Sequence, residues 1–316
     1  MTYKKLDKKL IIVAKNKYEL QGFIDELIVS KGINCDLNHI DVSSVVDMSH
    51  LFENYSFNGD ISQWNTSNVK SMYKMFSSSH FNGDISKWNV KNVIDMGYMF
   101  SNSKFNNCLS QWNTSNVKDM RYMFNNSQFN EDISRWDTSN VKDMNSMFHN
   151  SQFNNDISGW NVANVENMGW MFMNSQFNGD ISAWNVSKVE NMSKMFLSSQ
   201  FNGNISQWNT CSVEMMGYMF SNSQFNGDIS AWDISNVEMM EGMFYSSKFT
   251  GDISNWNVEN VKNIKDMFLK SQVSIPYWAK IKDYEDRKNA IEIYLQKNKI
   301  QKIVSPCVVG KNIFKV

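Results

Sequence analysis

The stretch FNGDISQWNTSNVKSMYKMF, residues 57–76, places one tryptophan, two methionines and two phenylalanines among small polar residues. A nearly identical stretch, FNGDISKWNVKNVIDMGYMF, begins at Phe81, which is 24 residues after Phe57. Phenylalanine returns at this spacing as far as Phe249, so nine units of 24 residues follow one another without insertion or deletion. A fixed period of this size indicates a stacked, solenoid-like array.

A degenerate tenth unit, INCDLNHIDVSSVVDMSHLFENYS, precedes the nine and carries Ile40 where they carry tryptophan. Such an atypical terminal repeat is expected at the end of an array. We therefore divide the chain into an N-terminal strand–helix cap (1–32), ten units (33–272, of which 33–56 is degenerate) and a C-terminal helix–strand cap (273–316).

Each cap has its own predicted elements. KKLIIVAK predicts a strand, and the next segment predicts a helix that ends at Gly32. The apolar face of that helix comprises Leu20, Phe23, Ile24, Leu27 and Ile28. In the C-terminal cap, we expect a helix around Tyr284 to Lys297, followed by two strands, KIQKIVS and CVVGKNIFKV.

Equivalent residues of successive units form columns, which we number by the residue of the unit that begins at Phe57. Columns 61, 64 and 66 end in a two-residue alternation, which predicts a short strand. Columns 69, 72, 75 and 76 are apolar at helical spacing, so they predict a short helix with Asn68 as its N-cap. The Trp, Met and Phe columns would then form one continuous core.

Small polar residues fill the remaining columns. The Gly59 column favours residues that tolerate a tight bend, and Asp60 follows it. We expect the Asp60 column to accept hydrogen bonds from turn amides. Repeated aspartates along a solenoid also suit calcium, which stays open as an alternative.

The phrase F-N-x-D-I-S-x-W-[ND]-[VT]-S-N-V-x-x-M-x-x-M-F resembles the repeat of the BspA-type leucine-rich-repeat surface proteins, in the methionine-rich variant also found in mycoplasma lipoproteins. The resemblance covers residues 33–272. It implies an α/β leucine-rich-repeat-like solenoid and a non-catalytic role in adhesion or recognition at the cell surface or after release. Because MTYKKLDKKLIIVAKNK contains no secretory core or lipid-attachment cysteine, a cytoplasmic interaction scaffold is the alternative.

Composition limits the other function classes. The chain has 31 basic and 32 acidic residues, so it has no overall charge that would attract nucleic acid. No apolar run is long enough to span a bilayer. Four cysteines and four histidines occupy unrelated columns, and no nucleotide, metal or catalytic motif is present. We expect a monomer without cofactor or metal, and an enzyme in the C-terminal cap is a minor alternative.

Two sets of surface residues are candidate binding sites for a protein or glycan. With columns 69, 72, 75 and 76 inward, columns 70 and 74 would point to solvent. Column 74 then supplies an outward aromatic row: Tyr98, Tyr122, Trp170 and Tyr218. Column 70 changes from lysines to a run of four glutamates. On the strand side, column 63 supplies a second candidate: Gln63, Lys87, Gln111, Arg135 and Gln207.

Overall fold

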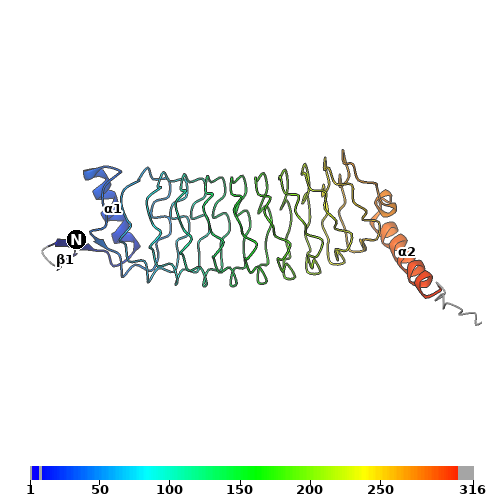
Figure 1. Cartoon of the computed structure of the whole chain (residues 1–316), viewed down its shortest axis with the longest axis horizontal. Coiled ribbons are helices and arrows are strands. Elements are labelled where there is room, and N and C mark those ends of the chain that lie inside the picture. The colour runs from blue at the N-terminus through cyan, green and yellow to red at the C-terminus, as the bar shows by residue number, and fades with distance from the viewer. Residues whose placement is uncertain (1, 7–8, 305–316) are drawn as a thin grey trace, which may run out of the picture.

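The computed structural model describes residues 2–6 and 9–304, and it shows the 24-residue units stacked side by side along the long axis of the molecule (Figure 1). Neighbouring units are joined by parallel bridges between residues 24 apart, which run along column 71 from Asp47 to Asn263. Helix α1 (Lys17–Lys31) lies at one end of the stack, and helix α2 (Tyr284–Val304) lies at the other.

The helix that the sequence predicts over columns 69–76 is absent from the units, and a series of turns replaces it. The N–H groups of Met72, Lys74 and Phe76 donate to carbonyls of the next unit, at 2.9 Å each. The N–H of Met75 instead closes a turn on the Met72 carbonyl at 3.1 Å. A helix of so few turns is marginal in water, whereas stacking gives these amides partners in the neighbouring unit.

Turns also replace the strand predicted over columns 61–66. Trp64 N–H donates to the Ile61 carbonyl at 3.2 Å, and Val69 N–H donates to the Thr66 carbonyl at 3.0 Å. Asn68, the predicted N-cap, reaches back to the previous unit, where its Nδ2 donates to the Ser43 carbonyl at 2.8 Å. The strand-plus-helix composition of each coil was therefore wrong, and the leucine-rich-repeat class itself stays a proposal.

The core is a set of continuous side-chain columns, in agreement with the apolar columns of the sequence. Phe57 and Phe81 stack with ring centroids 6.1 Å apart and planes within 1°, and Trp64 and Trp88 repeat this at 6.1 Å and 7°. Trp88 Nε1 also donates to the Ile61 carbonyl of the preceding unit at 3.1 Å. Each unit therefore buries its aromatic residues against both neighbours.

The N-terminal end of the array is covered by α1 and a small sheet. Strand β1 (Thr2–Leu6) pairs antiparallel with β2 (Lys9–Val13), and β2 continues in parallel onto β3 (Ile40–Asp41) of the degenerate unit. Leu20, Ile24 and Leu27 of α1 are buried. Gly32 ends the helix with φ 88°, which glycine adopts without strain.

The C-terminal end is covered by the 3₁₀ helix η1 (Tyr277–Lys280) and α2. Trp278 of η1 is fully buried, and Arg287 of α2 donates from Nη2 to the Val261 carbonyl at 2.7 Å. The strand expected at KIQKIVS was wrong, because residues 299–304 continue α2. The strand expected at CVVGKNIFKV lies outside the described residues.

Candidate functional site

The aromatic row of column 74 is only partly exposed. Tyr98, Tyr122, Trp170 and Tyr218 each adopt positive φ, from 56° to 58°, within the turns that link one unit to the next. Tyr98 and Tyr122 stack on each other, with ring centroids 4.3 Å apart and planes within 6°. Burial raises the pKa of Tyr98 to about 12, and the neighbouring Tyr122 adds to this shift. The faces of these two rings toward each other are therefore occupied, although both side chains are partly exposed.

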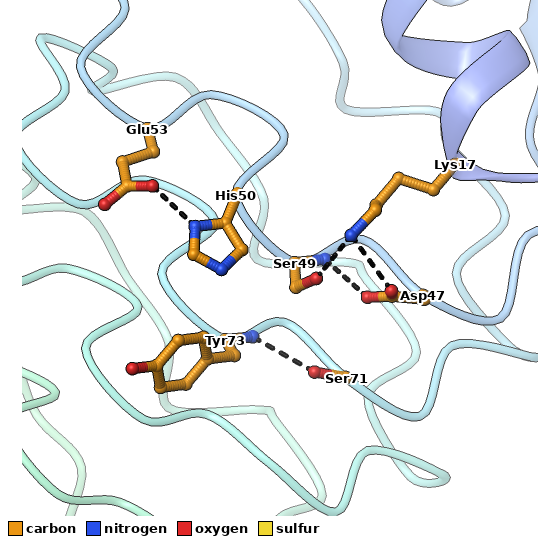
Figure 2. Close-up of polar contacts among 7 residues, drawn as sticks. All are labelled: Lys17, Asp47, Ser49, His50, Glu53, Ser71 and Tyr73. Carbon is orange, nitrogen blue, oxygen red and sulfur yellow. Dashed lines mark hydrogen bonds and ion pairs between the residues drawn. The ribbon is translucent and has the colours of Figure 1, made fainter.

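The row extends toward the N-terminus through Tyr73 of the neighbouring column and His50 of column 74 itself. Tyr73 contacts Tyr98 edge-on at 5.6 Å, and His50 contacts Tyr73 edge-on at 5.4 Å. Figure 2 shows the His50 ring above Tyr73, with Glu53 bonded to the imidazole. Lys74 lies over both tyrosine rings, at 5.7 Å from Tyr73 and 5.4 Å from Tyr98. This end of the row is a closed aromatic and cationic ladder.

The C-terminal end of the row is more open. Lys194 lies between two rings, with its Nζ 5.1 Å from the Trp170 ring and 5.7 Å from the Tyr218 ring. Tyr218 donates from its hydroxyl to Glu241 at 2.9 Å, and this bond is the largest cause of the raised pKa of Tyr218. Its ring covers Gly242, where a Cβ atom would lie 2.3 Å from the Tyr218 ring.

A groove of about 400 Å³ lies beside Tyr218. It is lined by Lys194, Leu197, Tyr218, Ser221, Asn222 and Tyr245. Two of these residues, Leu197 and Tyr245, belong to column 77 and were not among the binding residues predicted from the sequence. The signal was present in that column, because serine at Ser77 and Ser101 gives way to Met173, Leu197, Tyr245 and Leu269 in later units. The groove combines apolar walls with one lysine.

The second candidate surface, column 63, is exposed throughout. Its named members are Gln63, Lys87, Gln111, Arg135 and Gln207. Gln63, Gln111 and Gln207 each donate from Nε2 to the serine that precedes them, at 3.0, 3.4 and 3.3 Å. The column is therefore polar and solvated, and the structure does not bring its members together with the aromatic row.

Carboxylates are used in two different ways along the array. In the Asp60 column, Ser62 N–H donates to Asp60 Oδ1 at 2.9 Å, and this bond lowers the pKa of Asp60. The expected hydrogen bonds to turn amides are therefore present. Within residues 2–6 and 9–304, no three His, Cys, Asp or Glu side chains gather closely enough to hold a metal ion.

A second set of carboxylates lies on column 71: Asp47, Asp95, Asp119 and Asp143. Burial raises the pKa of Asp119 to about 6. The backbone N–H and the guanidinium charge of Arg121 act in the opposite direction and lower this pKa, but their effect is smaller. Arg121 Nε lies 3.0 Å from Asp119 Oδ2. Asp95 and Asp143, in the adjacent units, also raise the pKa of Asp119. The result is a partly buried line of like charges with one arginine beside it.

Comparison with known proteins gives one family. The family model described as "Mycoplasma protein of unknown function, DUF285" matches residues 25–128, 102–200 and 171–275. The chain belongs to the DUF285 family. The three overlapping matches together span the array, so the DUF285 chain is a repeat protein, as the 24-residue period predicts. No curated protein and no solved structure matches it.

The DUF285 assignment confirms the repeat character of the chain and its likeness to mycoplasma repeat proteins. In the part of the chain that the structure describes, no helix has the length and apolarity needed to cross a membrane.

Proposed function

We propose that the DUF285 chain is a non-catalytic recognition scaffold, which binds a protein or glycan along the aromatic row and the groove beside Tyr218. The observation that carries the proposal is this groove, where Leu197, Tyr218 and Tyr245 gather partly exposed apolar surface around Lys194. Tyrosine and tryptophan are the usual anchors of interfaces, with a polar surround. Continuous backbone bonds between units hold these side chains at fixed spacing.

The ring geometry favours a protein over a glycan. Sugars pack against open ring faces, but Tyr98 and Tyr122 use those faces on each other at 4.3 Å. The edges and hydroxyl groups that remain suit side chains of a folded partner, and the groove can receive an apolar one. The resemblance to BspA-type proteins supports a surface or released adhesion role, and the cytoplasmic scaffold is the alternative. Detection of the intact chain outside cells, without a lysis marker, would decide between the two.

The test compares two faces of the same molecule. Wild-type protein is immobilised beside a groove variant, Leu197→Ser with Tyr245→Ser, and a control variant of column 63, Gln63→Ala with Gln111→Ala. Each is exposed to host surface proteins and to a glycan array, and the melting temperature checks folding. We expect the groove variant to bind a captured protein at least about tenfold more weakly, while the control binds as wild type does.

Two results would overturn the proposal. Loss of binding in the column 63 variant alone would move the site to the opposite candidate surface. Equal binding by all three proteins would mean that neither surface is the site. A ligand recovered only from the glycan array would reject the preference for a protein partner.

A further inference from the structure

Along the array, column 70 itself is divided into a half that carries lysines and a half that carries glutamates. We number the ten units from residues 33–56 (unit 1) to 249–272 (unit 10). Units 2, 4 and 5 carry Lys70, Lys118 and Lys142, and units 6 to 9 carry Glu166, Glu190, Glu214 and Glu238. Every member of this column is exposed. Val46, Ile94 and Lys262 fill the remaining units 1, 3 and 10.

The charges of this column are only partly balanced within the chain. Lys142 Nζ lies 2.7 Å from Glu166, and Lys262 Nζ lies 2.8 Å from Glu238, so the run of glutamates has a lysine at each end. In the part of the chain that the structure describes, Glu190 and Glu214 form no ion pair. Backbone hydrogen bonds join column 70 residues of neighbouring units, as between the Glu190 N–H and the Glu166 carbonyl at 2.8 Å, so the four glutamates lie side by side. Like charges in such neighbouring positions are destabilising, and a partner can relieve this cost.

We infer that two copies of this chain associate antiparallel through column 70, so that the column 70 lysines of each copy face the column 70 glutamates of the other. The two-fold axis passes between units 5 and 6, at the centre of the ten units. It pairs Lys142 with the other copy's Glu166, Lys118 with its Glu190, and Lys70 with its Glu238. The remaining pairs are Ile94 with Glu214 and Val46 with Lys262.

The charges select this register over its neighbours. If the second copy is shifted by one unit in one direction, the Lys142 residues of the two copies face each other. If it is shifted by one unit in the other direction, their Glu166 residues face each other. An in-register parallel arrangement places every charge against the same charge. Of these arrangements, only the central antiparallel register avoids like-charge pairs, and it does so with all ten units overlapping, about 48 Å at about 4.8 Å per unit.

The shape of the acidic half fits this arrangement. A depression of about 500 Å³ is lined by Glu190, Ser212, Glu214, Asn236, Glu238 and Asn260. Column 68 carries asparagine in most units, but unit 8 carries the smaller Ser212, which leaves room for this depression. The central register places Ile94, which is 40% exposed, against this unit, where Met215 is 38% exposed. An apolar contact therefore lies among the ion pairs.

This association departs from the monomer that we expect from the sequence, and it uses a different column from the proposed partner site. Exposed ion pairs contribute little each, and the surface is narrow, so the dimer should be of moderate strength and sensitive to salt. The proposal therefore succeeds or fails without regard to any partner at the groove.

The test is sedimentation of the full chain with two charge-reversed variants. Lys118→Glu with Lys142→Glu makes units 4 to 7 uniformly acidic, and Glu166→Lys with Glu190→Lys makes them uniformly basic. We expect wild type to dimerise at concentrations up to about 200 μM, the range of a small transient interface, and each variant alone to dissociate at least about tenfold more readily. An equal mixture of the two variants should form a heterodimer, because every reversed pair is then complementary.

A groove variant, Leu197→Ser with Tyr245→Ser, serves as the control and should dimerise as wild type does. Melting temperatures show whether each variant is folded. Wild type that stays monomeric over this range would overturn the proposal, and so would variants that still dimerise alone. A mixture that stays monomeric while wild type dimerises would reject column 70 as the interface.

Discussion

Trp160 gives the sharpest test of the core. Its side chain is 3% exposed, and its ring contacts two rings of the preceding unit, Trp136 at 6.5 Å and Phe148 at 6.1 Å. Its Nε1 donates to the Ile133 carbonyl of the preceding unit at 3.1 Å. Replacement by alanine removes a large buried side chain from the middle of the array. We expect Trp160→Ala to lower the free energy of unfolding by about 3 to 5 kcal/mol, as large-to-small core changes do.

The hydrogen bond accounts for a small part of this loss. The Ile133 carbonyl also accepts the Trp136 N–H at 3.1 Å, so it keeps one partner when the indole is removed. Trp160→Phe retains most of the ring volume and loses the bond. We therefore expect it to cost about 1 to 2 kcal/mol, the sum of one net hydrogen bond and a modest loss of volume.

Urea unfolding followed by circular dichroism measures both variants, with Gln111→Ala as an exposed control that should change stability by less than about 0.5 kcal/mol. A fall in the slope of the transition for Trp160→Ala would show that the two halves of the array unfold separately. A loss below about 1 kcal/mol for Trp160→Ala would refute the view that the tryptophan column holds adjacent units together.

Three further changes test other parts of the structure. Burial raises the pKa of Asp119 to about 6 in the folded chain, so ionisation of this carboxyl lowers the free energy of unfolding as pH rises from about 4 to 6. Asp119→Asn should therefore raise the melting temperature at pH 7 and have little effect at pH 4. Gly242→Ala should lower the free energy of unfolding by about 1 to 3 kcal/mol, because the added Cβ would clash with the Tyr218 ring and because Gly242 has a φ of 58°, which disfavours alanine. Gly159→Ala should be tolerated, because nothing lies within 4 Å of the added Cβ. Deletion of residues 1–32 uncovers the apolar end of the first unit, and we expect aggregation or fraying by light scattering and hydrogen exchange; an equally stable, soluble product would remove the cap assignment.

The period and the core columns could be predicted from the sequence because both are properties of the repeat itself. Phe57, Trp64 and Met75 recur with unchanged spacing, and residues that recur in this way must pack against their own equivalents. The caps could be placed because they break the period. The helix of the N-terminal cap follows from the spacing of its apolar residues and from Gly32, which ends it.

The local conformation of each unit could not be predicted in the same way. Apolar residues at Val69, Met72 and Met75 suit one face of a helix, but successive turns closed by residues three apart give the same spacing. The backbone N–H groups of Met72 and Lys74 favour turns over a helix, because they donate hydrogen bonds to carbonyls of the next unit. The sequence of a single unit does not reveal these hydrogen bonds. One local signal was available in column 78, where Asn102 and Asn126 occupy a position with positive φ, which asparagine tolerates.

The misassigned helix also explains why the candidate surface had to be revised. On a helix, columns 70 and 74 lie on one solvated face, so Lys70 and Lys74 would be equivalent. In the series of turns they differ: Lys70 is exposed, whereas Lys74 lies over the rings of Tyr73 and Tyr98. Column 74 therefore contributes both to packing between units and to the surface, while column 70 is free of packing constraints. Contacts within the single chain explain the order of charges along column 70 only in part, because among the described residues they pair Lys142 with Glu166 and Lys262 with Glu238 and leave Glu190 and Glu214 without an ion pair. The proposed antiparallel dimer would account for the remaining charges.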